Sequence, residues 1–370
     1  MDEKFIVLVQ NVFPGFQLTL HALYKFSVDP SLGGTYSGVE PMGLLWSLRP
    51  VPGSKPWLRM RKMNVQTPME VTISVYPGYQ TEGFLDQVSL AGVVVERWYM
   101  APGVRRIPIT EAGLTATLFL PPGPGPFPGL LDLWGGGGKL VEYRSALLAS
   151  HGFASLALDY LTPQVTIETG KMVDNQYFER AFKVLEQHPQ ILSSRIGMIG
   201  LSFGTSITLK MAVYSQVAKF RCIVGISGSH VQPVDGSVEQ LMNFFKENTE
   251  KTRFNSENHV ICRDLLLPIP TDPSLKVDVG RLQCPLLLVV GEDDQNWPAY
   301  ESALDPPFTP FAKASTFRAV TSRQIMIALW GGETVAHSRA QEDAWRKTLV
   351  FLRAHLYGNV NTGVTSFSNL

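Results

Sequence analysis

The feature that most constrains this chain is a short turn with glycine at both ends, Gly200-Leu201-Ser202-Phe203-Gly204. It directly follows an apolar run at residues 195–199 and precedes a helix-like stretch from Thr205 to Val217. Strand, sharp turn and helix in this order are the context in which a G-x-S-x-G pattern marks a nucleophile elbow. A side chain at either glycine position would crowd the strained turn that lifts the serine hydroxyl above a sheet. We therefore interpret Ser202 as a candidate nucleophile.

The helix after the turn bears on the same interpretation. Its first N–H groups point to the place where an oxyanion would form beside Ser202. The alternative is a glycine-rich turn between a strand and a helix that carries no chemistry. The strand before the turn and the helix after it favour the elbow, because the five-residue pattern alone is a weak signal.

The composition is that of a globular protein with a substantial core. Apolar residues make up 45% of the 370 residues and charged residues 17%, with 32 basic and 32 acidic side chains. This balance gives no indication of a nucleic-acid partner. The cysteines are odd in number and two lie in apolar runs, so we expect reduced core residues and no disulfide framework. No two histidines have metal-ligand spacing, and we expect neither a metal nor a cofactor.

The sequence also bears on membranes and targeting. No apolar stretch approaches 18 uninterrupted residues, so we expect no membrane span. The N-terminus, Met1-Asp2-Glu3-Lys4, has the features of neither a transit peptide nor a secretory signal. The C-terminal Ser368-Asn369-Leu370 resembles a peroxisomal S-K-L tripeptide with asparagine in place of the basic residue, or is a frayed tail that ends in leucine by chance. We expect a cytosolic or peroxisomal protein of unknown oligomeric state.

The pattern of elements changes once along the chain. Residues 1–102 alternate short strand-like runs with Gly, Pro and Asp turns, which predicts a β-sandwich. Residues 103–357 alternate apolar strands with helices, which predicts a parallel sheet covered on both faces. Together with the elbow at Ser202, these two patterns predict a two-domain protein: an N-terminal β-sandwich followed by an α/β-hydrolase domain, and then a polar tail at 358–370. We expect apolar strands at 130–133, 154–158, 196–199, 223–226 and 286–290, and helices that include 177–187, 241–248 and 340–356.

A serine nucleophile needs a base, an acid that orients the base, and donors for the oxyanion. One donor is the N–H of the residue after the nucleophile, here Phe203. The other comes from a loop after an earlier strand, and Trp134-Gly135-Gly136-Gly137-Gly138 follows the strand at 130–133. We therefore assign the oxyanion hole to Phe203, Gly135 and Gly136. A phosphate-cradling loop is the weaker alternative, because the spacing of a P-loop is absent.

In α/β-hydrolases the acid and the histidine follow the nucleophile in that order. Asp294 follows the strand at 286–290 and is our candidate acid, with Asp293 as the alternative and a solvated turn as the interpretation without function. His337 and His355 are the histidines after Asp294, and His355 lies within the final helix. We expect His337 in a loop between a strand-like run at 324–329 and the final helix, where the base belongs. It could instead cap that helix or pack at its start.

The chain resembles the type I acyl-CoA thioesterases, in the family that also contains the bile acid-CoA:amino acid N-acyltransferases. The resemblance implies an N-terminal β-sandwich, an α/β-hydrolase domain, an acyl-CoA substrate, and hydrolysis to free fatty acid and CoA. The transferases carry cysteine at the elbow, so Ser202 favours the hydrolase branch over the N-acyltransferase alternative. The matching segments include Ser31–Tyr36, Pro41–Trp46, Pro102–Arg106, Leu118–Gly123, Leu140–Ser150 and Val290–Trp297.

The chain departs from the family pattern at the histidine. The family's catalytic histidine precedes an acidic residue, two prolines and an aromatic, and this stretch corresponds to residues 301–308 with Ser302 in the histidine's place. The helix and strand expected between acid and histidine are missing, and His337 matches a second family histidine outside the triad. The N-terminal part also looks shortened between Lys25 and Ser31. Two hypotheses follow: a thioesterase that uses Ser202, Asp294 and His337, or an acyl-CoA-binding variant impaired in catalysis.

Overall fold

The chain divides into two compact units, Met1–Tyr99 and Met100–Leu370. The computed structural model describes residues 1–5, 7–24, 40–48, 62–80, 86–136, 139–161, 166, 173–232, 243–244, 246–305, 320–322 and 327–358. The expected domain boundary between residues 102 and 103 lies near this division and stays a prediction. The expected tail at 358–370 lies outside the described residues apart from Gly358.

The first unit contains an antiparallel sheet in the order β1-β2-β3, formed by Leu18–Tyr24, Met69–Pro77 and Ala91–Arg97, together with the short helix α1, Gly43–Trp46. Side chains of β2 alternate between buried and less buried positions, as one covered face requires. Val71 and Ile73 of that face pack against a group that includes Phe5 and Leu45. This antiparallel sheet fits the predicted separate N-terminal β domain, and the described residues of the unit contain this one sheet.

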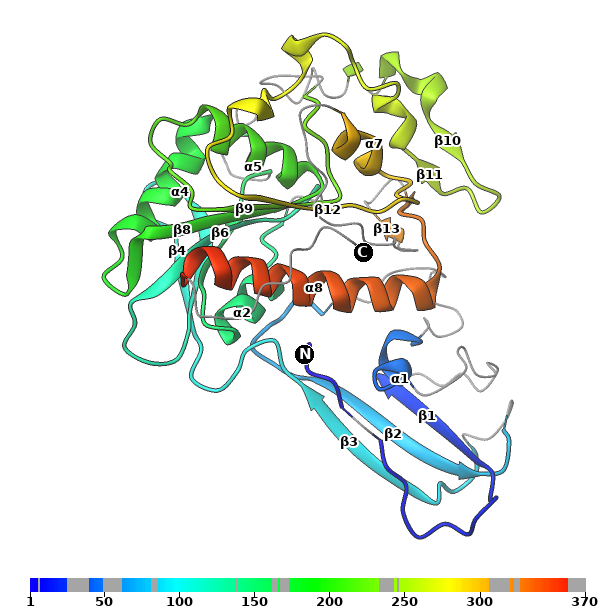
Figure 1. The fold of residues 1–370 in the computed structure, drawn as a ribbon. Helices are drawn as coiled ribbons and strands as arrows, with labels where there is room; N and C mark the ends of the chain where they lie inside the picture. The colour runs from blue at the N-terminus through cyan, green and yellow to red at the C-terminus, as the bar shows by residue number, and fades with distance from the viewer. Residues whose placement is uncertain are drawn as a thin grey trace. The chain divides into compact units, whose positions relative to one another are not determined.

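The second unit is built on a seven-stranded sheet in the order β12-β9-β8-β6-β7-β5-β4 (Figure 1). The pairs β4–β5 and β5–β7 are antiparallel, and the other pairs are parallel. The expected strands lie in or overlap β6, β7, β8, β9 and β12, which form the predicted parallel sheet, while β4 and β5 add antiparallel strands that the prediction of a parallel sheet did not include. The resulting mixed sheet with helical crossovers fits the predicted α/β-hydrolase domain. The strands are β4 Arg105–Ile109, β5 Thr115–Leu120, β6 Phe127–Leu133, β7 Ala154–Asp159, β8 Ile191–Leu201, β9 Ile223–Ile226 and β12 Leu286–Val289.

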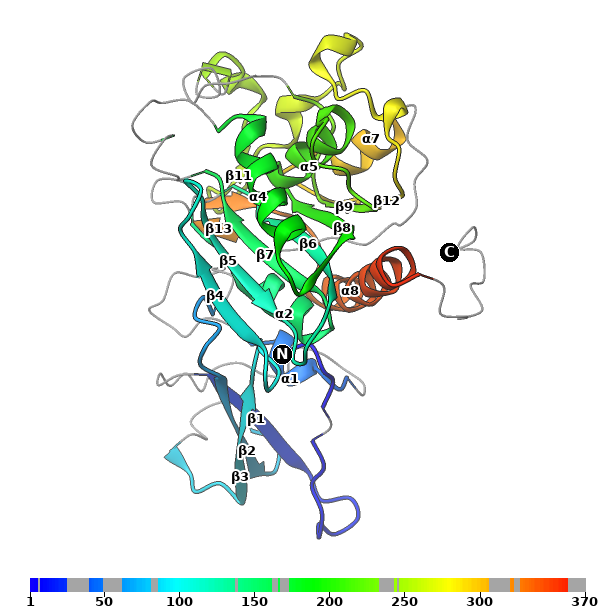
Figure 2. The same ribbon diagram turned by 90° about the vertical axis from the view of Figure 1, so that its left-hand side faces the viewer.

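Helices cover both faces of this sheet (Figures 1 and 2). The helices α4, Asn175–Gln187, and α5, Phe203–Tyr214, pack on one face in a large apolar cluster. The helices α2, Tyr143–Ser150, and α8, Thr334–Leu356, contribute to a second cluster on the other face. Because both faces are buried, the strands between them read as continuous apolar runs rather than alternating ones. Among the helices of the described ranges, none is long and apolar enough to cross a bilayer.

A second, smaller sheet lies after β9 in the chain, with the order β10-β11-β14-β13. Its strands are Arg253–Phe254, Val260–Ile261, Ile327–Leu329 and Val320–Ser322. The strand-like run expected at 324–329 therefore forms β14 in part, and residues 324–326 lie outside the described residues. β14 pairs with β11 and β13, so it does not extend the central sheet beyond β12.

Short helices complete the region between β9 and β14. Those that the structure describes in full are α7, Ala299–Leu304, and the 3-10 helices η2 Thr249–Lys251, η3 Arg263–Leu266, η4 Pro273–Leu275 and η5 Val279–Arg281. Ala299 and Ala303 of α7 pack against Leu288 and Val290 at the end of the central sheet. The helix expected at 241–248 falls partly outside the described residues.

The final helix begins earlier than the sequence predicts. We expected it to start at residue 340, whereas α8 starts at Thr334. The Glu333 carboxylate accepts hydrogen bonds from the N–H groups of Val335 and Ala336, which satisfies donors at the helix start. This cap places His337 in the first helical turn and not in the preceding loop.

Candidate active site

Ser202 sits in a strained turn between β8 and α5. Its φ is 56° and its ψ −124°, a left-handed conformation that is costly for a residue with a Cβ. The N–H of Ser202 donates to the carbonyl oxygen of Ile226 at 2.8 Å, and its own carbonyl accepts from the N–H of Thr205 at 2.9 Å. Ser202 is 5% exposed. Surrounding hydrogen bonds thus hold the serine in the conformation that a nucleophile elbow requires.

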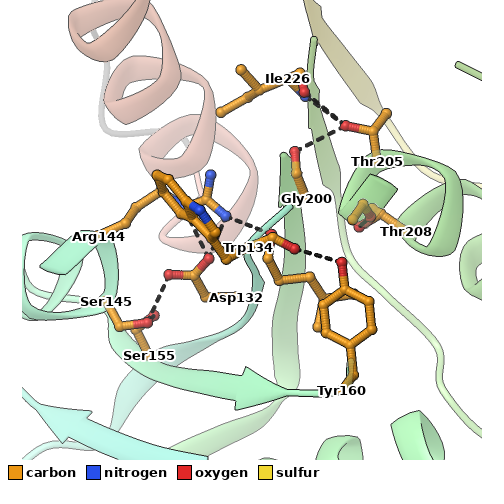
Figure 3. A network of polar contacts seen from close by, with 12 residues as sticks. Asp132, Trp134, Arg144, Ser145, Ser155, Tyr160, Gly200, Thr205, Thr208 and Ile226 are labelled. Atoms are coloured by element: carbon orange, nitrogen blue, oxygen red, sulfur yellow. Dashed lines mark hydrogen bonds and ion pairs between the residues drawn. The ribbon is translucent and has the colours of Figure 1, made fainter. Parts of the chain in front are cut away.

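The two glycines of the turn allow three backbone segments to meet. A Cβ at Gly200 would lie 2.2 Å from the carbonyl oxygen of Gly204, and a Cβ at Gly204 would lie 2.7 Å from that of Leu133. Thr205 Oγ1 donates to the Gly200 carbonyl oxygen at 3.1 Å or to that of Ile226 at 3.0 Å, which ties the turn to β9 (Figure 3). Both predicted glycine constraints therefore have a steric basis in the structure.

The three residues predicted to form an oxyanion hole differ in their burial and in their position relative to Ser202. Phe203 is the first residue of α5, where backbone N–H groups have no partner within the helix. Gly135 follows β6 and is buried, and a Cβ there would lie 2.7 Å from Ser202 Cβ and 3.2 Å from Ser202 Oγ. Gly136 is exposed, while Gly137 and Gly138 lie outside the described residues. The structure thus brings the backbone of Gly135 against the serine side chain.

A buried ion pair anchors the strand that leads to this loop. Arg144 of α2 donates from Nε to Asp132 Oδ1 at 2.8 Å (Figure 3). A guanidinium nitrogen of Arg144 also donates to the Leu133 carbonyl oxygen at 2.9 Å. Ser145 Oγ donates to the second carboxylate oxygen, Asp132 Oδ2, at 2.7 Å. Both charged residues are less than a tenth exposed, so their mutual pairing is what makes the burial tolerable.

The same network reaches the loop itself. The Arg144 guanidinium lies 5.2 Å from the centroid of the Trp134 ring, a cation–π arrangement. Tyr160 donates its hydroxyl to the Trp134 carbonyl oxygen. Trp134 precedes Gly135, so these contacts fix the approach of the loop to Ser202. Sequence reasoning missed this network, although an aspartate inside an otherwise apolar strand was a visible signal.

Asp294 is buried beyond the end of β12, and Asp293 is exposed. The Asp294 Oδ1 atom accepts hydrogen bonds from the N–H groups of Asn296 and Trp297, each at 2.9 Å. Burial raises the pKa of the Asp294 carboxyl to about 7, against the opposing effect of these hydrogen bonds. Asp293 instead accepts from the N–H of Gly332 at 2.6 Å. Of the two carboxylates, the structure therefore places Asp294 inside the protein.

Trp297 connects the serine to this aspartate. Its indole Nε1 donates to Ser202 Oγ at 2.7 Å, while its backbone N–H is bound to Asp294. Sequence reasoning did not assign a role to Trp297. The one available signal was its position three residues after the candidate acid.

His337 lies in the first turn of α8, where its backbone N–H donates to the Glu333 carbonyl oxygen at 2.8 Å. The hydrogen bonds that the structure describes for Ser202 and Asp294 involve other partners than His337. Its assignment as the base stays a prediction. His355 lies near the end of the same helix, with its ring 4.5 Å from that of Phe351.

Ser302, which the family resemblance aligns with the family's histidine, is buried in α7. Its hydroxyl donates to Ser229 Oγ at 2.8 Å. Nearby, His230 Nε2 lies 2.8 Å from Asp305 Oδ2, which joins the loop after β9 to the end of α7. Within the described ranges, no group of three or more His, Cys, Asp or Glu residues is placed to hold a metal ion.

Replacement of Gly200 by alanine tests the close approach at the elbow. The new methyl group would overlap the Gly204 carbonyl oxygen and Thr208 Oγ1, at 2.2 and 2.5 Å, so we expect a loss of at least about 2 kcal/mol of stability. Gly92→Ala in β3 is the control, because its Cβ would meet ordinary contacts at 3.6 Å. Thermal unfolding of both variants measures the difference, and equal unfolding temperatures would contradict the steric argument.

Replacement of Asp294 by asparagine tests the burial of its charge. The folded carboxyl, with a pKa of about 7, keeps a proton that the unfolded chain releases near pH 4. The wild type therefore loses stability as pH rises from 5 to about 7, on the order of 3 kcal/mol at about 1.4 kcal/mol per unit. The amide of asparagine does not titrate, so the stability of Asp294→Asn relative to the wild type rises as the pH is raised from 5 to 8. Denaturant unfolding of both proteins at pH 5 and at pH 8 measures this change. A stability difference between the two proteins that is the same at both pH values would refute it.

Comparison with known proteins matches both parts of the chain to one family. The profile described as "Acyl-CoA thioester hydrolase/BAAT N-terminal region" matches residues 25–111. The profile described as "BAAT / Acyl-CoA thioester hydrolase C terminal" matches residues 173–304 and 300–358.

Similar proteins include several thioesterases. Mouse acyl-coenzyme A thioesterase 3 is 36% identical over 375 residues, which cover 92% of this chain and 83% of that protein. Mouse peroxisomal succinyl-coenzyme A thioesterase is 35% identical, with 88% of this chain and 82% of that protein covered. Human acyl-coenzyme A thioesterase 1 is 34% identical, with 90% and 83% covered. The elbow, the hydrolase sheet and these matches together show that the chain belongs to the acyl-CoA thioester hydrolase/BAAT family.

Proposed function

We propose that this protein hydrolyses acyl-CoA to free fatty acid and CoA, with Ser202 as the nucleophile. The observation that carries the proposal is the elbow geometry of Ser202, with the Gly135 backbone against its side chain. Relatives that are at least a third identical and bear the name acyl-CoA thioesterase support the substrate class. The substrate is therefore the thioester of a fatty acid with CoA, and the reaction needs no cofactor.

The reaction proceeds in two stages in this proposal. Ser202 Oγ adds to the thioester carbonyl carbon as its proton passes to a base, and the C–S bond then breaks. CoA leaves as the thiolate and takes up the proton from the base. Water then adds to the ester carbon of the acyl-enzyme as one of its protons passes to the base, the bond from Ser202 Oγ to the acyl carbon breaks, and Oγ takes up that proton as the fatty acid leaves.

The described residues supply the supporting groups for these steps. The N–H groups of Phe203 and Gly135, with Gly136 as the further predicted donor, stabilise the carbonyl oxygen as it becomes negative. Asp294 as carboxylate orients the base, and His337 is the proposed base. The raised pKa of Asp294, about 7, means that this carboxylate forms only as pH rises through neutrality.

Replacement of Ser202 by alanine tests the proposed function. We expect the wild type to release CoA thiol from a long-chain acyl-CoA, and Ser202→Ala to lose about four or more orders of magnitude in rate because the nucleophile is gone. Thiol release followed with a chromogenic disulfide measures both rates. Equal release by wild type and variant, or no release by the wild type, would reject the proposal.

A second candidate function is acyl-CoA binding without turnover. The family resemblance aligns Ser302 with the family's histidine, β14 lies outside the central sheet, and the C-terminal family profile matches in two segments that overlap at residues 300–304. Each observation favours a chain altered in the region of the family's histidine. This candidate predicts acyl-CoA binding with turnover near background.

Replacement of His337 by alanine separates the two candidates. If His337 is the base, His337→Ala loses about three orders of magnitude in thiol release and keeps acyl-CoA affinity, because only proton transfer is removed. Calorimetric titration with a non-hydrolysable acyl-CoA thioether measures affinity beside the rate. Unchanged turnover would remove His337 from the mechanism, and affinity without any wild-type turnover would establish the binding candidate.

The N-acyltransferase reaction is the remaining alternative, and serine at the elbow disfavours it. Added glycine or taurine would yield an amide product only in that case, as mass spectrometry of the products would show. For location we propose cytosol or peroxisome, supported by the name of the mouse peroxisomal relative. The tripeptide Ser368-Asn369-Leu370 lies outside the described residues, and a fluorescent fusion that stays cytosolic would argue against a peroxisomal location.

A further inference from the structure

The candidate nucleophile is bound to a group that the proposed mechanism does not use. The Ser202 hydroxyl oxygen accepts a hydrogen bond of 2.7 Å from the indole N–H of Trp297, a residue 95 positions away in the chain. A distance of 2.7 Å is at the short end of the range for N–H···O bonds. An indole N–H donates and does not accept, so Trp297 is not a base.

Trp297 is held in place from two sides. Its backbone N–H donates to Asp294 Oδ1 at 2.9 Å, and Asp294 is 1% exposed. Its side chain packs against the apolar cluster of Leu288, Val290, Ala299 and Ala303. The turn between β12 and α7 therefore fixes the indole before any substrate arrives, and preorganised donors are the ones that stabilise a reacting charge.

We propose that Trp297 is a catalytic residue whose indole N–H positions Ser202 Oγ and stabilises negative charge on that oxygen. Charge develops on Oγ as the hydroxyl proton leaves during attack, and again when the Oγ–acyl bond breaks in the second stage. The indole keeps its proton in both stages. The indole N–H binds a lone pair of Oγ and does not engage the O–H hydrogen. The hydroxyl proton therefore remains available for transfer to a base.

This proposal rests on the role of Ser202 as nucleophile, but not on the identity of the acyl donor. It also gives Asp294 a second role, which is to position Trp297, because the carboxylate that is the proposed acid accepts a hydrogen bond from the backbone N–H of Trp297. The serine and the aspartate are thus linked through one residue, within the described part of the chain, without a histidine between them.

Indole N–H resonances test the hydrogen bond itself. The chain has seven tryptophans, and Trp297→Phe identifies the Trp297 signal in a nitrogen-15 correlation spectrum by its loss. We expect Ser202→Ala to move that signal upfield in the proton dimension, as the loss of a strong acceptor requires, and to leave the other indole signals in place. An unmoved Trp297 signal would overturn the proposal.

A serine-reactive fluorophosphonate tests the effect on reactivity. In that reaction Oγ bonds to phosphorus, fluoride leaves, and the hydroxyl proton goes to base or solvent. We expect Trp297→Phe to slow labelling of Ser202 about 10- to 100-fold, the range for one hydrogen bond to a charged oxygen. Trp345→Phe is the matched control, because Trp345 packs in the second core cluster against His151, and we expect wild-type labelling from it.

The two measurements separate this proposal from the proposed function. Slower labelling in Trp297→Phe, at an unfolding temperature equal to that of Trp345→Phe, supports the role of Trp297 even if acyl-CoA is not hydrolysed. Labelling at the wild-type rate would overturn the catalytic role even if thioesterase activity is found. With hydrolysis present, we expect Trp297→Phe to lower kcat by a similar factor with little change in KM, because the charge exists only in the transition state.

Discussion

The close approach of three backbone segments at the elbow is the constraint on which the rest of the site depends. Gly200 and Gly204 let β8 turn into α5 directly against the end of β6, and Gly135 lets the next loop meet the Ser202 side chain. A single added methyl group in this region would meet backbone atoms, which cannot move aside as a flexible side chain can. The position of the serine, of the α5 N-terminus and of the Gly135 loop therefore comes from one packing arrangement.

The two buried aspartates near this arrangement, Asp132 and Asp294, differ in how their negative charge is stabilised. Asp132 has a full cationic partner in Arg144, together with the Ser145 hydroxyl, so its charge is compensated inside the protein. The Asp294 carboxylate forms no ion pair within the described residues, and backbone N–H groups bind one of its oxygens. Burial then outweighs these bonds and the pKa rises to about 7. The first aspartate therefore serves to hold β6 and α2 together, whereas the raised pKa of the second makes its charge change near neutral pH.

The sequence predicted what depends on local pattern and missed what depends on distant contacts. Apolar runs located the strands of the central sheet, and the glycines located the elbow, because both signals are contiguous in the chain. The start of α8 was placed too late, since the Glu333 cap precedes any apolar periodicity. The pairing of β14 with β11, the Asp132–Arg144 pair and the Trp297–Ser202 bond join residues that no local pattern relates. The roles of Ser202, Asp294, His337 and the oxyanion donors remain predictions that rest on topology and family pattern.

The contact between Trp297 and Ser202 also clarifies how the two candidate functions differ. An indole donor and an oxyanion hole both stabilise charge, and neither removes a proton from the hydroxyl. A chain with these groups and no base would bind an acyl-CoA and hold a serine in line with its carbonyl carbon, yet attack would wait for solvent to accept the proton. A base at hydrogen-bonding distance would complete the same site without any change to the elbow, the Gly135 loop or Trp297. Turnover and mere binding therefore differ by one proton acceptor, and the rest of the described site serves either function equally.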